Sequence, residues 1–185
     1  DRPTEARTAE GDYISWREHI VDDEATGGVA LRGSDGLVVA DLNRDGFADI
    51  VSVHESDDQY DGVPEGHVRI AFGTPSPDAW HLATLAEGPA AGAAEDVAVG
   101  DLNGDGWLDI VVACELAHLI YFENPGADEG PGAAAAASAD DGAARAARRV
   151  GEWARLIPAV TRERGSFIRV FLADLNGDGR PEVVT

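Results

Sequence analysis

Side chains that carry oxygen recur at fixed spacing in three segments of this 185-residue sequence. Residues 41–49, 101–109 and 174–182 each read Asp-Leu-Asn-X-Asp-Gly-X-X-Asp/Glu, with oxygen donors at positions 1, 3, 5 and 9 and glycine at position 6. Alternate residues of a tight loop can face one centre, and the glycine permits a sharp turn with positive φ. The carbonyl of position 7 can then face inward. Ca²⁺ takes roughly six to eight such oxygens in flexible geometry, so the spacing predicts three calcium sites.

Each predicted site has four side-chain ligands and one backbone carbonyl, from position 7. By loop, the ligands are Asp41, Asn43, Asp45, Phe47 and Asp49; Asp101, Asn103, Asp105, Trp107 and Asp109; and Asp174, Asn176, Asp178, Arg180 and Glu182. Mg²⁺ prefers fewer protein ligands, and no His or Cys in the loops favours a transition metal. The third loop is expected to be the weakest, because Glu182 is one methylene longer than Asp and Pro181 stiffens the preceding residue. Asp101→Ala is expected to lower thermal stability in calcium and to change it little in chelator.

Three other interpretations of the loops are an EF-hand, a dockerin-type loop and a plain polar turn. An EF-hand begins in the same way but has a bidentate Glu at position 12, whereas position 12 here is Ser52, Val112 and Thr185. EF-hands have flanking helices and dockerin-type loops are followed by one, whereas these loops lie between β-branched runs. Plain polar turns rich in Asp, Asn and Gly are the structural alternative. Three copies with donors at the same positions favour calcium over it.

Short strand-like segments must position these loops. In residues 66–72, Val68, Ile70 and Phe72 alternate with Arg69 and Ala71, which predicts a half-buried strand. Similar runs precede and follow it in the same order in two repeats: 37–40, 50–53, 66–72 and 80–85, then 96–100, 110–115, 118–122 and 153–160. Each loop lies between the first two runs of its repeat, as in a hairpin. Four short strands per repeat, in series, are typical of β-propeller blades.

The predicted fold class is therefore all-β, built of four-stranded antiparallel propeller blades, about two complete and partial ones at both ends. The expected divisions are a lead at 1–12 and a partial propeller at 13–185, made of a last strand at 13–23, blades at 36–88 and 95–160, and a first hairpin at 167–185. Residues 126–149 are a Gly/Ala/Asp-rich, low-complexity insertion in which 143–150 can be helical; no function is expected from it. Propellers close with about four to eight blades, so the remaining blades are expected from flanking sequence.

The repeat resembles the calcium-binding FG-GAP and VCBS repeats of integrin-alpha-like β-propellers. The resemblance rests on the three loops and covers roughly residues 13–125 and 150–185. It implies an extracellular or cell-surface propeller, usually seven-bladed, with Ca²⁺ held in hairpin loops at one rim. The first hypothesis for the whole protein is a non-catalytic binding module that recognises a protein or carbohydrate ligand. The Gly-Ala-Pro element expected after the second strand is replaced by residues 54–56 and 114–116, and residues 121–126 look more like VCBS proteins, so integrin-style cell adhesion does not follow. The alternative is an enzyme, since some propellers with such loops resemble polysaccharide lyases or sugar dehydratases.

A second group of candidates follows the second strand of each repeat and is expected on the face opposite the loops. It comprises His54, Glu55, Asp57, Asp58, Asp61, Glu115 and His118. Such a cluster can hold a second metal or supply acid–base pairs, although a solvated acidic loop is the favoured interpretation. Trp16, Trp80 and Trp153 are expected to pack between blades. Cys114, the one cysteine, is expected to be a partly buried thiol without assigned chemistry.

The net charge of the sequence disfavours two classes of binding partner, nucleic acids and anionic membranes. The sequence has 35 Asp plus Glu against 14 cationic side chains, all arginine, for a formal net charge of −21. Nucleic-acid binding needs clustered cations, and an anionic membrane surface is disfavoured for the same reason. No apolar run approaches the length of a membrane span. The composition favours solubility and cation binding.

Overall fold

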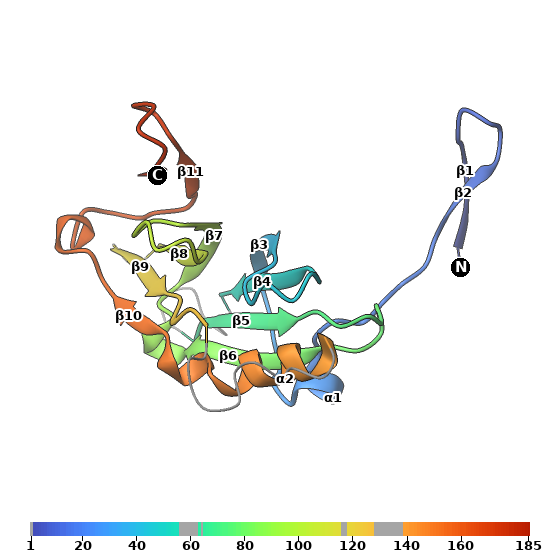
Figure 1. The fold of residues 1–185 in the computed structure, drawn as a ribbon, viewed down its shortest axis with the longest axis horizontal. Helices are drawn as coiled ribbons and strands as arrows, with labels where there is room; N and C mark the ends of the chain where they lie inside the picture. The colour runs from blue at the N-terminus through green and yellow to red at the C-terminus, as the bar shows by residue number, and fades with distance from the viewer. Residues whose placement is uncertain (1, 56–62, 64, 116–117, 128–138) are drawn as a thin grey trace.

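The computed structural model describes residues 2–55, 63, 65–115, 118–127 and 139–185, and its strands pair into antiparallel β-sheets (Figure 1). One four-stranded sheet has the order β3-β4-β5-β6 and a second has the order β10-β9-β8-β7. Two further sheets are the two-stranded hairpins β1-β2 and β11-β12. The strands are β1 (Arg2–Arg7), β2 (Tyr13–Trp16), β3 (Ser34–Ala40), β4 (Asp49–His54), β5 (His67–Phe72), β6 (His81–Glu87), β7 (Ala94–Gly100), β8 (Asp109–Cys114), β9 (His118–Glu123), β10 (Ala154–Leu156), β11 (Phe171–Ala173) and β12 (Glu182–Val184).

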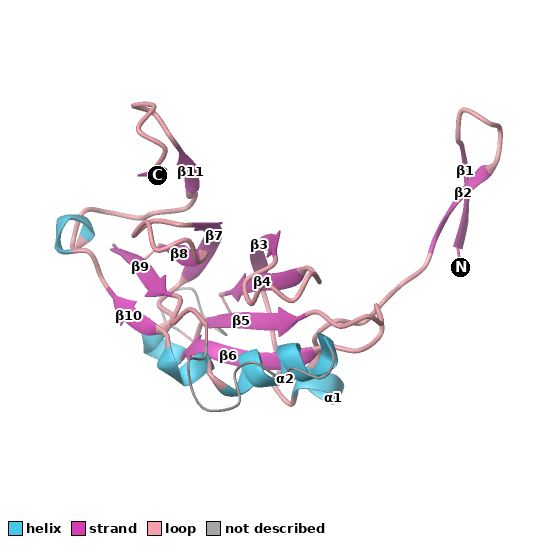
Figure 2. Ribbon diagram, viewed as in Figure 1, coloured by secondary structure: helices cyan, strands magenta, loops and turns pink. Residues whose placement is uncertain are grey.

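Helical segments are few in the described residues (Figure 2). They are α1 (Glu24–Gly27), α2 (Ala139–Arg148) and three 3₁₀ turns, Gly88–Ala90, Val150–Glu152 and Ala159–Thr161. None of the helices in the described part is long and apolar enough to cross a membrane. The predicted fold class is confirmed, because the two repeats form four-stranded antiparallel sheets with their strands in chain order.

The three predicted loops connect the first two strands of their sheets in the same register. The residue before the first Asp pairs with the residue at position 9: Ala40 with Asp49, Gly100 with Asp109, and Ala173 with Glu182. The final carboxylate of each loop therefore belongs to the first residue of a strand, whose backbone is fixed by the ladder. The loops consequently have the same starting geometry in all three repeats.

Apolar side chains pack the successive sheets against each other. The larger core contains Val51, Val53 and Ile70 from the first sheet and Ile110 and Val112 from the second, all fully buried. A smaller core around Val111 and Val170 joins the second sheet to the chain entering β11. Strand β7 contacts β3 and β4 on one side and β11 on the other, so the first strands of successive sheets are neighbours. This serial packing is consistent with propeller blades.

Gly36 permits the close approach of β3 and β7. A Cβ atom built on Gly36 would lie 2.7 Å from the Cα of Asp96, 2.9 Å from a methyl carbon of Val53 and 3.0 Å from the amide nitrogen of Val97. Two of these three neighbours are backbone atoms, which cannot rotate away as a side chain can. The first two sheets can therefore pack at this distance only if residue 36 has no side chain.

The N-terminal region differs from the expected lead at 1–12 and blade strand at 13–23. Residues 2–7 form β1, which pairs with β2 as a separate hairpin, and Figure 1 shows this hairpin set apart from the two larger sheets. Ladder hydrogen bonds between these two runs, with a turn at Thr8–Asp12, explain why the lead is a strand. Trp16 is 69% exposed in this hairpin, so the expectation that it packs between blades is wrong for the structure described.

Strand β5 is buried on both faces, not half-buried as the alternation predicts. Arg69 is 4% exposed, and its Nε donates to Asp22 Oδ2 at 2.8 Å while an Nη contacts the other oxygen of the same carboxylate. Asp22 lies just before α1, far from β5 in sequence. A charge can be buried when it is paired and hydrogen-bonded, so a distant segment has covered the face that the arginine appeared to mark as exposed.

The insertion at 126–149 also departs from expectation. Its described part contains α2, which begins at Ala139, four residues before the predicted helix, and packs against β5 and β6. Ala143 is fully buried there. The helix carries acidic residues in its first turn and arginines in its last turn, an arrangement that favours the helix dipole. The segment is thus part of the packed structure, and one of its faces lines a cavity described below.

Candidate metal-binding loops

Hydrogen bonds within the first loop bring its oxygen donors to one place. Asp41 Oδ1 accepts from the amide of Asp45 at 3.2 Å and its Oδ2 accepts from the amide of Gly46 at 3.0 Å. Asn43 Oδ1 accepts from the same Asp45 amide at 3.0 Å, and Asp45 Oδ1 accepts from the amide of Phe47 at 2.9 Å. Gly46 has φ of 90°, as the sharp turn predicts. The side chains at positions 1, 3 and 5 are therefore held within a single turn of backbone.

The second and third loops repeat this network. Asp101 accepts from the amide of Gly106 at 2.8 Å and Asp174 from the amide of Gly179 at 2.9 Å. In both loops the amide of position 5 donates to the side-chain oxygen of position 3, and the amide of position 7 donates to the carboxylate of position 5. These hydrogen bonds are 2.8–2.9 Å long. The amides of Gly179, Gly177 and Asp178 also lower the pKa of Asp174, since hydrogen bonds to the ionised form stabilise it.

The carboxylate at position 9 lies beneath each loop and joins it to the sheet. Asp49 is fully buried, with Oδ2 accepting from the amide of Leu42 at 2.7 Å and Oδ1 from the amide of Gly73 at 2.9 Å. Asp109 repeats this with the amides of Leu102 and Asn124, both at 3.0 Å. Glu182 accepts from the amide of Leu175 at 2.7 Å. The longer Glu182 therefore reaches the position-2 amide as the two aspartates do.

Burial, together with the nearby carboxylates of Asp45 and Asp41, raises the pKa of Asp49 to about 7 against the two amide hydrogen bonds, which lower it. Ionising this group next to two other carboxylates is unfavourable without a counter-charge. A divalent cation supplies that charge, and every donor in the loop is a hard oxygen. The donor set thus fits Ca²⁺; that the fifteen predicted ligands bind it stays a prediction.

Arg44 distinguishes the first loop from the other two. It occupies position 4 with φ of 59°, where the other loops have Gly104 and Gly177 with φ of 81° and 76°. Its guanidinium carbon lies 4.2 Å from the ring centroid of Trp107, and the side chain donates to the carbonyl of Gly106. The contact links the first loop to the second, which helps to offset the cost of a left-handed non-glycine residue.

An acidic cluster lies away from the loops. Glu55 follows β4, Glu95 lies in β7 and Glu115 follows β8, and one carboxylate oxygen from each lies within 4.8 Å of the others. All three side chains are partly buried. Burial raises the pKa of Glu95, followed in effect by the charge of Glu55. A proton or a cation would relieve this repulsion, so the cluster could hold a metal ion.

The composition of this cluster differs from the second group of candidates expected from sequence. Glu55 and Glu115 are brought together, but their third member is Glu95, and neither His54 nor His118 belongs to the group. His54 is 7% exposed and its Nε2 lies 3.0 Å from Ser52 Oγ. Asp57, Asp58 and Asp61 lie outside the described residues. Glu95 belongs to no motif, and only the packing of β7 beside β3 and β4 brings it here.

Two further expectations concern packing residues. Cys114 is fully buried, not partly, and its thiol donates to the carbonyl of Ala91 at 3.4 Å. Burial raises the pKa of this thiol to about 12, which leaves it protonated and unreactive at neutral pH. Trp153 is 9% exposed within the larger core, in agreement with a packing role, whereas Trp80 is only partly buried.

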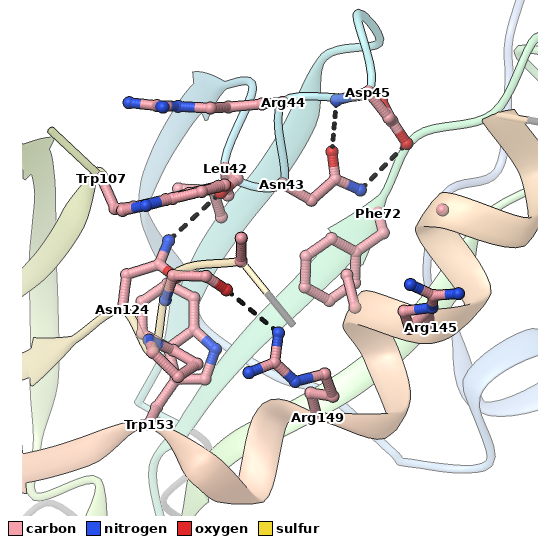
Figure 3. A pocket seen from close by; sticks show the side chains of 15 residues that line it. Leu42, Asn43, Arg44, Asp45, Phe72, Trp107, Asn124, Arg145, Arg149 and Trp153 are labelled. Carbon is pink, nitrogen blue, oxygen red and sulfur yellow. Dashed lines mark hydrogen bonds between the residues drawn. The ribbon is translucent and has the colours of Figure 1, made fainter. Parts of the chain in front are cut away.

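A cavity of about 270 Å³ opens between the first loop and α2. Figure 3 shows Arg44 lying over Trp107 at one end, Phe72 in the middle, and Arg145 and Arg149 projecting from the helix. Asn124 holds part of the cavity wall in place, because its Nδ2 donates to the carbonyls of Leu42 at 3.1 Å and Leu108 at 3.0 Å. The cavity was not expected from sequence, because the insertion provides one of its walls.

The four-stranded sheets and their hairpin loops define a protein built of propeller-type β repeats. Residues 41–112 match the family described as FG-GAP-like repeat, and this span contains the first two loops and the strands from β4 into β8. The resemblance found in the sequence is thereby confirmed for this part of the chain. The chain has no significant match among curated proteins or among solved structures.

Proposed function

We propose that the FG-GAP-like repeats form a calcium-stabilised, non-catalytic binding module, with one Ca²⁺ in each of the three loops. One observation carries the proposal: the same hydrogen-bonded loop occurs three times, in the same register between two strands, and in each copy the predicted metal ligands are all oxygen atoms. A polar turn explains one such loop. It does not require a buried carboxylate beneath two others, as Asp49 lies beneath Asp41 and Asp45.

The proposed role of the ions is structural. Each ion joins the loop oxygens to the position-9 carboxylate, and so ties the turn to the first residue of the second strand. Because the carboxylates repel one another without the ion, binding is linked to folding and adds to stability by mass action. Extracellular modules hold calcium with Kd of roughly 10⁻⁴–10⁻³ M, which suits the extracellular or cell-surface location and the protein or carbohydrate ligand proposed for the whole protein.

Calcium titration of the 185-residue chain tests this proposal. We expect calorimetry to give about three sites and the melting temperature to rise with Ca²⁺ and to fall in chelator, with a much smaller effect of equimolar Mg²⁺. The magnitude follows from mass action: at one hundred times Kd, each site adds about 2.7 kcal/mol. Equal melting temperatures with calcium and with chelator would sink the proposal.

Asp101→Asn distinguishes a role of Asp101 as a calcium ligand from its role in the hydrogen bonds of the turn. Asp101→Ala removes the acceptors of the Gly104 and Gly106 amides, so the structure indicates a loss of about 1 kcal/mol or more even in chelator, contrary to the expectation from sequence. Asn keeps one carbonyl oxygen and removes the charge. We therefore expect Asp101→Asn to lower stability mainly in calcium and to remove one site from the titration, with Asp12→Asn, an exposed residue outside the loops, as control.

A further inference from the structure

The cavity between the first loop and α2 combines positively charged, polar and apolar lining residues. Arg44, Arg145 and Arg149 contribute positive charge, and Asn43 and Asp45 contribute hydrogen-bonding groups from the loop. Apolar surface comes from Leu42, Phe72, Trp107 and Trp153. Small-molecule sites are typically concave and mostly apolar, with a few convergent polar groups, and this cavity has that composition.

The concentration of arginine is unusual for this chain. The whole sequence has 14 cationic side chains against 35 acidic ones, yet three arginines line one cavity of about 270 Å³ alongside a single carboxylate, that of Asp45. The positive field of these arginines favours an anion at that point, whereas the acidic surface elsewhere on the protein disfavours anions. The ligand of the cavity should therefore carry a negative charge.

Arg149 is held in place by neighbouring groups. Arg149 Nη1 donates to the carbonyl of Gly126 at 3.0 Å, while its Nε and Nη2 donate to Glu152 Oε2 at 3.0 and 2.8 Å. A guanidinium has five N–H groups, and these contacts use three. Arg149 directly follows α2, and Arg145, four residues earlier within α2, also lines the cavity. Carboxylate and phosphate are the anions that planar guanidinium groups bind with matched geometry, and a carboxylate is the one of the two that a sugar ring can carry as part of its own carbon skeleton.

The remaining walls suit a sugar ring. The rigid floor is made by Phe72 and Leu42, exposed by only 1% and 2%, and by Asn124, whose Nδ2 is committed to two carbonyls. Figure 3 shows the loop residues Asn43 and Asp45 across the cavity from Arg149. A pyranose has an apolar C–H face for the aromatic side and hydroxyl groups for the amide and carboxylate side. With a carboxylate on the ring, it satisfies all three walls.

We propose that this cavity binds an acidic monosaccharide unit, a uronate, with its carboxylate directed to Arg145 and Arg149 and its ring beside Trp107, above the buried floor that includes Phe72. The insertion that carries α2 is then a ligand-binding element of the module and not only a packing element. This assignment rests on residues of the cavity and does not require that the loops bind calcium.

Calorimetric titration of the 185-residue chain with glucuronate tests the proposal, with glucose as the neutral counterpart of the same ring. We expect glucuronate to bind at least about tenfold more tightly, since a hydrogen-bonded charge pair is worth that much. Arg145→Gln should weaken glucuronate binding about tenfold. Arg148→Gln, an exposed position on the same helix that is outside the cavity, should leave it unchanged.

The variants are compared at equal fold content, checked by circular dichroism. Arg145→Lys, which keeps the charge but not the planar fork, should bind with intermediate affinity and serves if Arg145→Gln does not fold. Titrations in chelator are included, so failure of calcium binding and failure of sugar binding are seen separately. Equal binding of glucose and glucuronate, no binding of either, or an equal loss in Arg145→Gln and Arg148→Gln would each overturn the proposal.

Discussion

At the scale of single residues, burial in the folded chain makes some acidic side chains harder to ionise. Asp49 and Glu95 are both acids whose pKa is raised by burial, but the structure gives them different neighbours. Asp49 accepts two backbone hydrogen bonds inside a loop rich in oxygen donors, whereas Glu95 lies near two other glutamates. Each is more easily protonated in the folded chain than in the unfolded chain, so each lowers the stability of the metal-free protein at neutral pH.

Glu95→Gln should stabilise the protein at pH 8 in chelator and leave it nearly unchanged at pH 4. The folded chain keeps the proton of Glu95 to higher pH than the unfolded chain, so the wild-type stability falls as pH rises between those two pKa values. Gln removes this fall because it does not ionise. Denaturant unfolding at both pH values measures the effect, with the exposed Glu18→Gln as control. A gain at pH 4 equal to that at pH 8 would contradict the electrostatic cause.

At the scale of the elements, local pattern predicts strands and long-range packing decides their faces. The loop motif and the β-branched runs were sufficient to predict the hairpins and four-stranded sheets, because both are short-range signals. The alternating pattern in β5 predicted that Arg69 is exposed. That prediction is wrong, because Asp22 and α1 cover that face of the strand. The helix within the insertion was partly foreseen from alanine content, but its docking on β5 and β6 was not. Docking depends on tertiary contacts that no local pattern encodes.

Gly36→Ala tests the packing of the first sheet against the second. The added Cβ would lie 2.7 Å from the Cα of Asp96, so β3 and β7 must separate, and we expect a loss of about 1–3 kcal/mol. Gly151→Ala is the matched control, because a Cβ there meets nothing within 4 Å and its φ is not positive. Denaturant unfolding compares the two variants. An equal effect at both positions would mean that β3 and β7 do not pack this closely in solution.

For the whole molecule, the first loop and the cavity share residues. Asn43 and Asp45 line the cavity and are also predicted calcium ligands, and Arg44 between them lies over Trp107 at the end of the cavity. The third loop has no residue in that lining. The second loop contributes Trp107 alone. The two proposals therefore predict that calcium and ligand binding are coupled mainly through the first loop.

Calcium should strengthen glucuronate binding mainly through the first loop. An ion there fixes Asn43 and Asp45 and reduces the negative charge facing the ligand, so we expect glucuronate affinity to fall about fivefold or more in chelator, within the usual range of coupling energies. Asp41→Asn should abolish this calcium effect, whereas Asp174→Asn, the same position in the third loop, should retain it. Because linkage is reciprocal, saturating glucuronate should tighten one calcium site by the same factor. Calcium dependence that survives Asp41→Asn would show that the ion acts on the cavity from elsewhere in the fold.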